Sequence, residues 1–138
     1  MLYQDLRYPL ANYPLGVPEL WDSGQFYACH EYLETAWMQT PVSQTAQRHL
    51  LQGLLQVAVA FHHHASGNVH GFQVLLSKGV AHLEQDGVDR EAEKYAEAEK
   101  YCETEKIGCP AEVSDRPRDW AAFIKAVKRL SRQTPNQS

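Results

Sequence analysis

A long run without a charged side chain extends from His49 to Ser77 and contains no Asp, Glu, Lys or Arg. Within it, Leu50 to Phe61 is apolar nearly all round a helical wheel, which is typical of a helix enclosed by other helices. Polar side chains interrupt the run, and its purely apolar part, Val57–Phe61, is far too short to cross a bilayer. The chain is therefore predicted to fold around a central helix that is buried by protein and not by lipid.

Composition narrows the class of protein and the compartment. The chain has 138 residues, enough for one hydrophobic core, and a formal net charge of −4, which argues against a general nucleic-acid binder. Cys29, Cys102 and Cys109 form no disulfide framework and lack the short C-x-x-C spacing of a zinc site. No basic leader and apolar stretch mark a secretory signal. We expect a cytoplasmic protein with no nucleic-acid or membrane partner.

Turn signals divide the chain into five or six helices and show no strand-like alternation. Residues 1–17 are expected to form an extended arm on the surface, 18–132 one helical domain, and 133–138 a disordered tail. The expected helices are Pro18–Ser23, Gln25–Gln39, Ser43–Ala65, Val69–Glu84, Arg90–Lys106 and a last amphipathic helix that carries Trp120, Phe123, Ile124, Val127 and Leu130.

The helix ends have recognisable signals. Ser43 is expected to cap the central helix, and Asn68 to cap the next helix through the amide of Gly71. Gly24 and Gly67 suit the left-handed conformation that ends a helix. The two tight turns at these glycines give hairpins that resemble tetratricopeptide-type repeats, although two turns do not make a solenoid. The predicted class is all-α, a small single-domain helical bundle with tetratricopeptide-like hairpins.

Charge is distributed unevenly in the second half of the chain. Asp86 to Glu105 is acidic, whereas Arg116 to Arg132 is basic. We expect these segments to lie near each other, within one chain or across a symmetric homodimer, because faces of like charge would repel.

The sharpest functional signal lies in the helix before the central one. At 3.6 residues per turn, His30, Glu34 and Trp37 share a face with Phe26 and Leu33, which are expected core residues. Removing an unpaired carboxylate from water costs several kcal/mol. This face is therefore expected to carry a partner, a ligand or a water-filled cleft.

A second polar feature lies on the central helix, where Gln52, Gln56, Val59 and His63 fall on one side of the helical wheel. Two histidines and one carboxylate suit zinc or ferrous iron, so His30, Glu34 and His63 are the candidate metal ligands.

Two other readings stay open for the same residues. Trp37, Gln52 and Gln56 are the candidate contacts of a small polar ligand in a metal-free pocket. Alternatively, His30 and Glu34 form an intrahelical pair whose only role is to close the core.

The remaining histidines give weaker evidence for a metal site. His62, His63 and His64 point in three directions on one helix, while His49, His70 and His82 have no partner at helical spacing. No nucleophile elbow, phosphate loop or dinucleotide-binding fingerprint is present.

Three segments together resemble the bacterial and archaeal family catalogued as domain of unknown function 309. They are residues 24–37, 51–58 and 67–71, and the family signature H-x-x-x-E-x-x-W/Y falls on His30, Glu34 and Trp37. The resemblance covers about Glu19 to Glu84. It implies a small all-helical protein whose signature has been suggested to bind metal, with no established activity. Cys29 stands where the family usually has alanine.

The sequence thus predicts a cytoplasmic protein with a polar pocket between two core helices. The pocket is expected to bind a divalent metal or a small polar ligand, and a metal-dependent hydrolase is one form of this hypothesis. The rival hypothesis is a helical scaffold or interaction module in which the polar residues are structural. Whether the protein is an enzyme stays open.

Overall fold

The computed structural model describes residues 6–10, 13–95 and 119–132, and every regular element among them is a helix. This confirms the all-α class, although the tetratricopeptide-like arrangement stays a prediction. The helices are α1 (Val17–Asp22), α2 (Phe26–Gln39), α3 (Thr45–Ala65), α4 (Val69–Leu83), the helical segment 88–95, and α6 (Trp120–Arg132). The rest of the predicted Arg90–Lys106 helix and the predicted tail lie outside the described residues.

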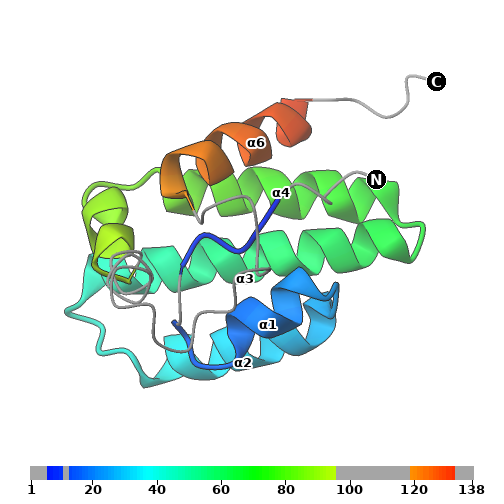
Figure 1. The fold of residues 1–138 in the computed structure, drawn as a ribbon. Helices are drawn as coiled ribbons and strands as arrows, with labels where there is room; N and C mark the ends of the chain where they lie inside the picture. The colour runs from blue at the N-terminus through cyan, green and yellow to red at the C-terminus, as the bar shows by residue number, and fades with distance from the viewer. Residues whose placement is uncertain (1–5, 11–12, 96–118, 133–138) are drawn as a thin grey trace, which may run out of the picture.

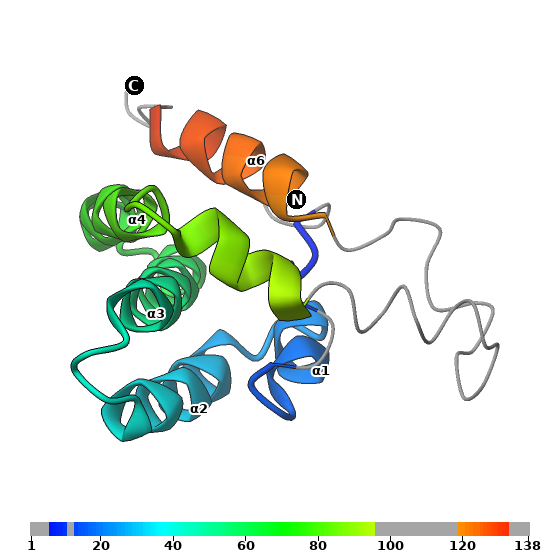
Figure 2. The ribbon, with the colours of Figure 1, turned by 90° about the vertical axis from the view of Figure 1, so that its left-hand side faces the viewer.

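The central helix is α3, as its apolar sequence predicts. It packs against α2 on one flank and against α4 on the other, and eight of its residues are buried. Figure 1 shows α3 and α4 side by side, with α2 along the opposite flank of α3. Figure 2 shows α3 and α4 nearly end-on, with α4, α3 and α2 in a row, and α1 and the helical segment 88–95 on one side of this row. None of the described helices is long and apolar enough to cross a membrane.

Trp21 of α1 is the centre of the core on that side of the row. Its ring lies 5.5 Å from the ring of Phe26 in α2, 5.8 Å from Phe61 in α3 and 5.8 Å from Phe123 in α6. Tilted and edge-to-face aromatic pairs at such distances contribute about 0.5–1.5 kcal/mol each beyond burial. A single aromatic residue of a short helix therefore connects four helices.

The N-terminal residues differ from the expected surface arm because they are part of the core. Leu6, Tyr8 and Leu10 are buried, and the indole Nε1 of Trp21 donates to the Leu6 carbonyl at 2.9 Å. The backbone amide of Tyr8 donates to Asp22 at 3.2 Å. Pro9 between Tyr8 and Leu10 is buried as well, so this stretch is part of the core.

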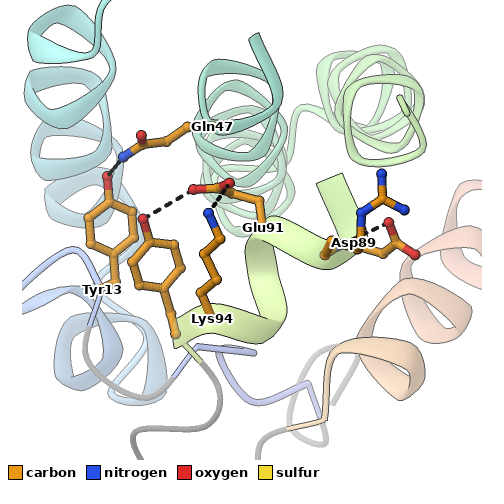
Figure 3. A network of polar contacts seen from close by, with 7 residues as sticks. Tyr13, Gln47, Asp89, Glu91 and Lys94 are labelled. Atoms are coloured by element: carbon orange, nitrogen blue, oxygen red, sulfur yellow. Dashed lines mark hydrogen bonds and ion pairs between the residues drawn. The ribbon is translucent and has the colours of Figure 1, made fainter. Parts of the chain in front are cut away.

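A polar network attaches this N-terminal segment to the rest of the bundle (Figure 3). Gln47 of α3 donates to the Tyr13 hydroxyl at 2.6 Å, and the Tyr13 ring stacks on Tyr95 at 4.0 Å. The Tyr95 hydroxyl in turn donates to Glu91 at 3.3 Å. Burial, and then the nearby Tyr13 and Glu91, raise the pKa of Tyr95 to about 12, so the hydroxyl stays protonated and keeps its donor role.

The turn between α1 and α2 and the turn between α3 and α4 form as their local sequences predict. Gly24 and Gly67 have φ values of 84° and 86°, in the left-handed region that favours glycine. The Asn68 side chain accepts from the Gly71 amide at 2.9 Å and caps α4. The prediction for Ser43 is wrong, because α3 begins at Thr45 and has no side-chain cap at its N-terminus.

The contact between α3 and α4 depends on two glycines that face each other. A Cβ atom on Gly53 would lie 2.5 Å from Leu83 Cδ2 and 2.9 Å from the Gly79 carbonyl oxygen. A Cβ atom on Gly79 would lie 2.9 Å from Val57 Cγ2. All three distances are shorter than van der Waals contact, so the two backbones approach more closely than side chains at these positions would allow.

The basic last helix packs beside α4. Lys128 of α6 forms an ion pair with Glu84 at 2.7 Å, and Asp86 and Asp89 line the same hollow as Trp120. The described part of the acidic segment therefore lies near the start of the basic helix, within one chain. Exposed pairs of this kind contribute roughly 0–1 kcal/mol, so they affect arrangement more than stability.

Gly53→Ala tests the close contact of α3 and α4. Alanine favours a helix by about 1 kcal/mol over glycine, so an uncrowded site would gain stability. We expect instead a loss of about 1–3 kcal/mol in the free energy of unfolding, because the new methyl group meets Leu83 and the Gly79 carbonyl. Urea unfolding measures the change, and Ser77→Ala on the exposed side of α4 is the control. A stabilised Gly53→Ala variant would contradict the close contact.

Candidate functional site

The polar stripe of α3 faces away from the core. Phe61 points toward Trp21 of α1, and His63, two residues later, lies about 200° further round the helix. The four stripe residues are all half-buried, and no described element covers this side of the helical row in Figure 2. We call this side, formed by α2, α3 and α4, the outer face. The predicted site residues are Gln52, Gln56 and His63 on α3 and His30, Glu34 and Trp37 on α2.

His30 and Glu34 form the predicted pair one helical turn apart. His30 Nε2 lies 3.5 Å from Glu34 Oε1, longer than the N–H···O hydrogen bonds typical of proteins. The His30 side chain is 21% exposed and that of Glu34 is 50% exposed. The expectation that both lie among core residues is wrong for Glu34, which stays in water and avoids the cost of burying a charge.

Two buried polar atoms lack a hydrogen-bond partner in the described structure. They are Nδ1 of His30 and Oε1 of Gln56. An unpaired polar atom away from water costs about 1–3 kcal/mol, and few such atoms occur in a native protein. Both belong to residues that the sequence marks as site candidates, His30 on α2 and Gln56 on α3.

The three consecutive histidines point in three directions, as predicted. The His62 ring lies 5.2 Å from Tyr27 of α2, and the His64 ring lies 4.8 Å from Phe72 of α4. His63 instead faces the turn, where its Nδ1 lies 3.3 Å from the Asn68 amide nitrogen. Since Asn68 accepts from Gly71 through its oxygen, its NH₂ group faces His63 and donates to it.

The predicted metal ligands are therefore not all brought together. Among the described residues, no three His, Cys, Asp or Glu side chains are grouped closely enough to hold a metal ion. His30 and Glu34 are neighbours on α2, whereas His63 supports the cap of α4. A metal at the signature would have two protein ligands and would complete its coordination with water.

Trp37 is occupied by an arginine that the sequence analysis did not single out. The guanidinium carbon of Arg48 lies 4.3 Å from the centre of the Trp37 ring. Arg48 also donates to the carbonyl oxygens of Trp37 at 3.3 Å and Thr40 at 2.8 Å. A cation at the C-terminus of a helix satisfies its unpaired carbonyls and its dipole. In the described structure Trp37 is therefore the stacking surface for a side chain of this protein.

Cys29, next to the signature histidine, is an apolar packing residue. It is buried between α1 and α2, with Sγ 3.9 Å from the Val17 carbonyl oxygen. Burial, and then the charge of Asp22, raise the pKa of its thiol to about 12. Only the thiolate is a good nucleophile or metal ligand, so Cys29 is inert at neutral pH.

One pair of histidines was not predicted from the sequence. His49 of α3 and His82 of α4 have no partner at helical spacing, yet their Nδ1 atoms lie 2.9 Å apart. Each is one turn from a glycine of the close helix contact, His49 from Gly53 and His82 from Gly79. Each histidine is thus one helical turn from a glycine that faces the other helix. This shared spacing is the sequence feature that could have predicted the pair.

A hollow of about 760 Å³ lies between the end of α4, the turn after it and the first turns of α6. Its walls include Glu84, Asp86, Asp89, Arg90 and Trp120. These residues belong to other elements than the signature pair, so this hollow is separate from the predicted site.

The comparison with known families supports the resemblance seen in the sequence. The model of the family described as a domain of unknown function (DUF309) matches residues 17–75. The resemblance to DUF309 is confirmed. The matched segment runs from the start of α1 into α4 and includes the whole outer-face set from His30 to His63. No curated protein and no solved structure matches the chain.

Arg48→Met tests the structural use of Trp37 in the DUF309 segment. We expect the free energy of unfolding to fall by about 1–3 kcal/mol, because two carbonyl oxygens at the end of α2 lose their donor. Urea unfolding measures the loss, and Arg129→Met, at an exposed position of α6, is the control. Equal effects of the two substitutions would show that the stacked arginine contributes no more than a surface charge.

Proposed function

We propose that this protein binds a small organic cation with N–H donors, such as an amine, on the outer face at His30 and Gln56. The observation that carries the proposal is the pair of buried, unpartnered atoms, His30 Nδ1 and Gln56 Oε1. A ligand that pairs with both atoms removes two desolvation penalties, and this provides free energy for binding.

The chemistry of the ligand follows from the protonation of His30. Its Nε2 faces the Glu34 carboxylate at 3.5 Å, which favours the tautomer with the proton on Nε2. Nδ1 then has a lone pair and accepts a hydrogen bond. Gln56 Oε1 is an acceptor as well, so the complementary ligand supplies donors at both ends.

The surroundings of His30 favour a positive charge. Glu34 provides a half-exposed carboxylate that a cation can reach from solvent. The ring of Tyr27 lies 5.2 Å from His30 and 5.2 Å from His62, and Tyr27 is 53% exposed. An exposed aromatic ring attracts organic ammonium ions through the cation–π interaction.

A divalent metal, zinc or ferrous iron, is the second candidate, and one distance favours it. Two ligands with bonds of about 2.0–2.2 Å to a tetrahedral ion lie about 3.4 Å apart. The 3.5 Å between His30 Nε2 and Glu34 Oε1 fits that separation better than it fits a hydrogen bond. The hydrolase hypothesis depends on this candidate, because a metal lowers the pKa of bound water and makes it a nucleophile.

NMR titrations of the tag-free protein with 1,4-diaminobutane and with Zn²⁺ test both candidates. For the amine, we expect shifts of the His30 ring and the Gln56 amide that are lost in His30→Phe and Gln56→Leu. Zinc binding is expected to disappear in His30→Phe and Glu34→Gln but to persist in Gln56→Leu, since Gln56 is not a metal ligand. His70→Gln, at an exposed position of α4, is the control.

The rival scaffold hypothesis predicts different results. Neither probe shifts the His30 ring, and His30→Phe is less stable than the wild type, because the pair with Glu34 that closes the core is lost. That combination would overturn both binding candidates.

A further inference from the structure

The strongest unassigned feature of the molecule is the contact between His49 and His82. The Nδ1 atoms are 2.9 Å apart and the ring centres 5.1 Å apart, with 32° between the ring planes. The rings therefore meet through these nitrogens and do not stack face to face. The two residues are 33 positions apart in sequence, and both side chains are half-buried.

The backbone places these rings firmly. Gly53 and Gly79 let α3 and α4 approach so closely that a Cβ atom on Gly53 would lie 2.9 Å from the Gly79 carbonyl oxygen. His49 and His82 are each one turn from that contact, on the same edge of the helix pair. Two ligands on rigid helices are held more accurately than ligands on loops.

Two imidazole nitrogens at this distance cannot both present lone pairs to each other, so they share one proton. Burial, and then the charge of His49, lower the pKa of His82, because a second proton would place two cations side by side. At neutral pH the pair is therefore available to an ion that replaces the shared proton.

We propose that His49 Nδ1 and His82 Nδ1 are two ligands of a divalent transition-metal site that spans α3 and α4. The ion would complete its coordination with water, since the described residues include no group of three metal-binding side chains. This site is independent of His30 and of the proposed function.

The distance selects among metals. Nitrogens with bonds of about 2.0–2.1 Å lie about 2.9 Å apart at a right angle, and about 3.3–3.4 Å apart at a tetrahedral angle. The observed 2.9 Å fits the right angle of square-planar or tetragonal Cu²⁺ and Ni²⁺ better than tetrahedral Zn²⁺. Small rotations about χ2, whose energy well is broad for histidine, would turn both lone pairs toward one ion.

Calorimetric titration of the tag-free protein with Ni²⁺ tests the site. We expect one ion per chain and a higher melting temperature with Ni²⁺, because the ion binds only when the two helices are docked. His49→Gln and His82→Gln should each weaken binding by about tenfold or more, since removing even an outer partner of a metal ligand costs on the order of 10- to 100-fold. His70→Gln, at an exposed position of α4, should bind like the wild type.

Ni²⁺ that completes a tetragonal coordination shell with water is paramagnetic, so the amides that it broadens in NMR spectra locate it. Broadening centred on residues 49 and 82 of the wild-type protein supports the proposal. This result does not depend on whether the substituted chains fold. Broadening centred on His62–His64, or unchanged affinity in folded His49→Gln and His82→Gln variants, would overturn it. Tighter binding of Zn²⁺ than of Ni²⁺ would overturn the assigned right-angle geometry.

Discussion

The close contact of α3 with α4 at Gly53 and Gly79 is the constraint on which the rest of the structure depends. Without side chains at these two positions, the helices come close enough for continuous packing along their length, where many small dispersion contacts add up. The α4 helix then occupies one flank of α3 and α2 the other. Only two faces of α3 are left, one toward the core and one toward the outer face.

Those two faces of α3 explain why a core helix carries a polar stripe. One face sends Phe61 into the aromatic contacts around Trp21, where burial of apolar surface stabilises the fold. The other face cannot be apolar throughout without exposing a large hydrophobic patch on the outside of the bundle. It carries Gln56 and His63 at half-buried positions, where polar atoms lose water but gain few partners. The polar residues thus avoid a hydrophobic patch on the outer face, but their half-buried positions leave them with unmet hydrogen-bonding capacity.

Local rules of sequence predicted much of the fold. The helices within the described residues, their left-handed glycine ends and the Asn68 cap depend on a few neighbouring residues, and these are observed. Features set by packing between distant segments were not predicted, and these include the burial of Tyr8, the exposure of Glu34 and the meeting of His49 with His82. Helical periodicity gives the direction of a side chain on its own helix, but not what covers it. The sequence therefore predicts which residues share a helix face more reliably than it predicts what surrounds them.

The central claim is that His30 Nδ1 and Gln56 Oε1 have unmet hydrogen-bonding capacity on the outer face. A high-resolution crystal structure of the protein tests it most directly, because ordered waters and bound groups are visible there. The account predicts an ordered water or ligand within about 3.2 Å of each atom. A structure in which both atoms bond to other protein groups, with no ordered molecule beside them, would contradict the account and favour a purely structural role.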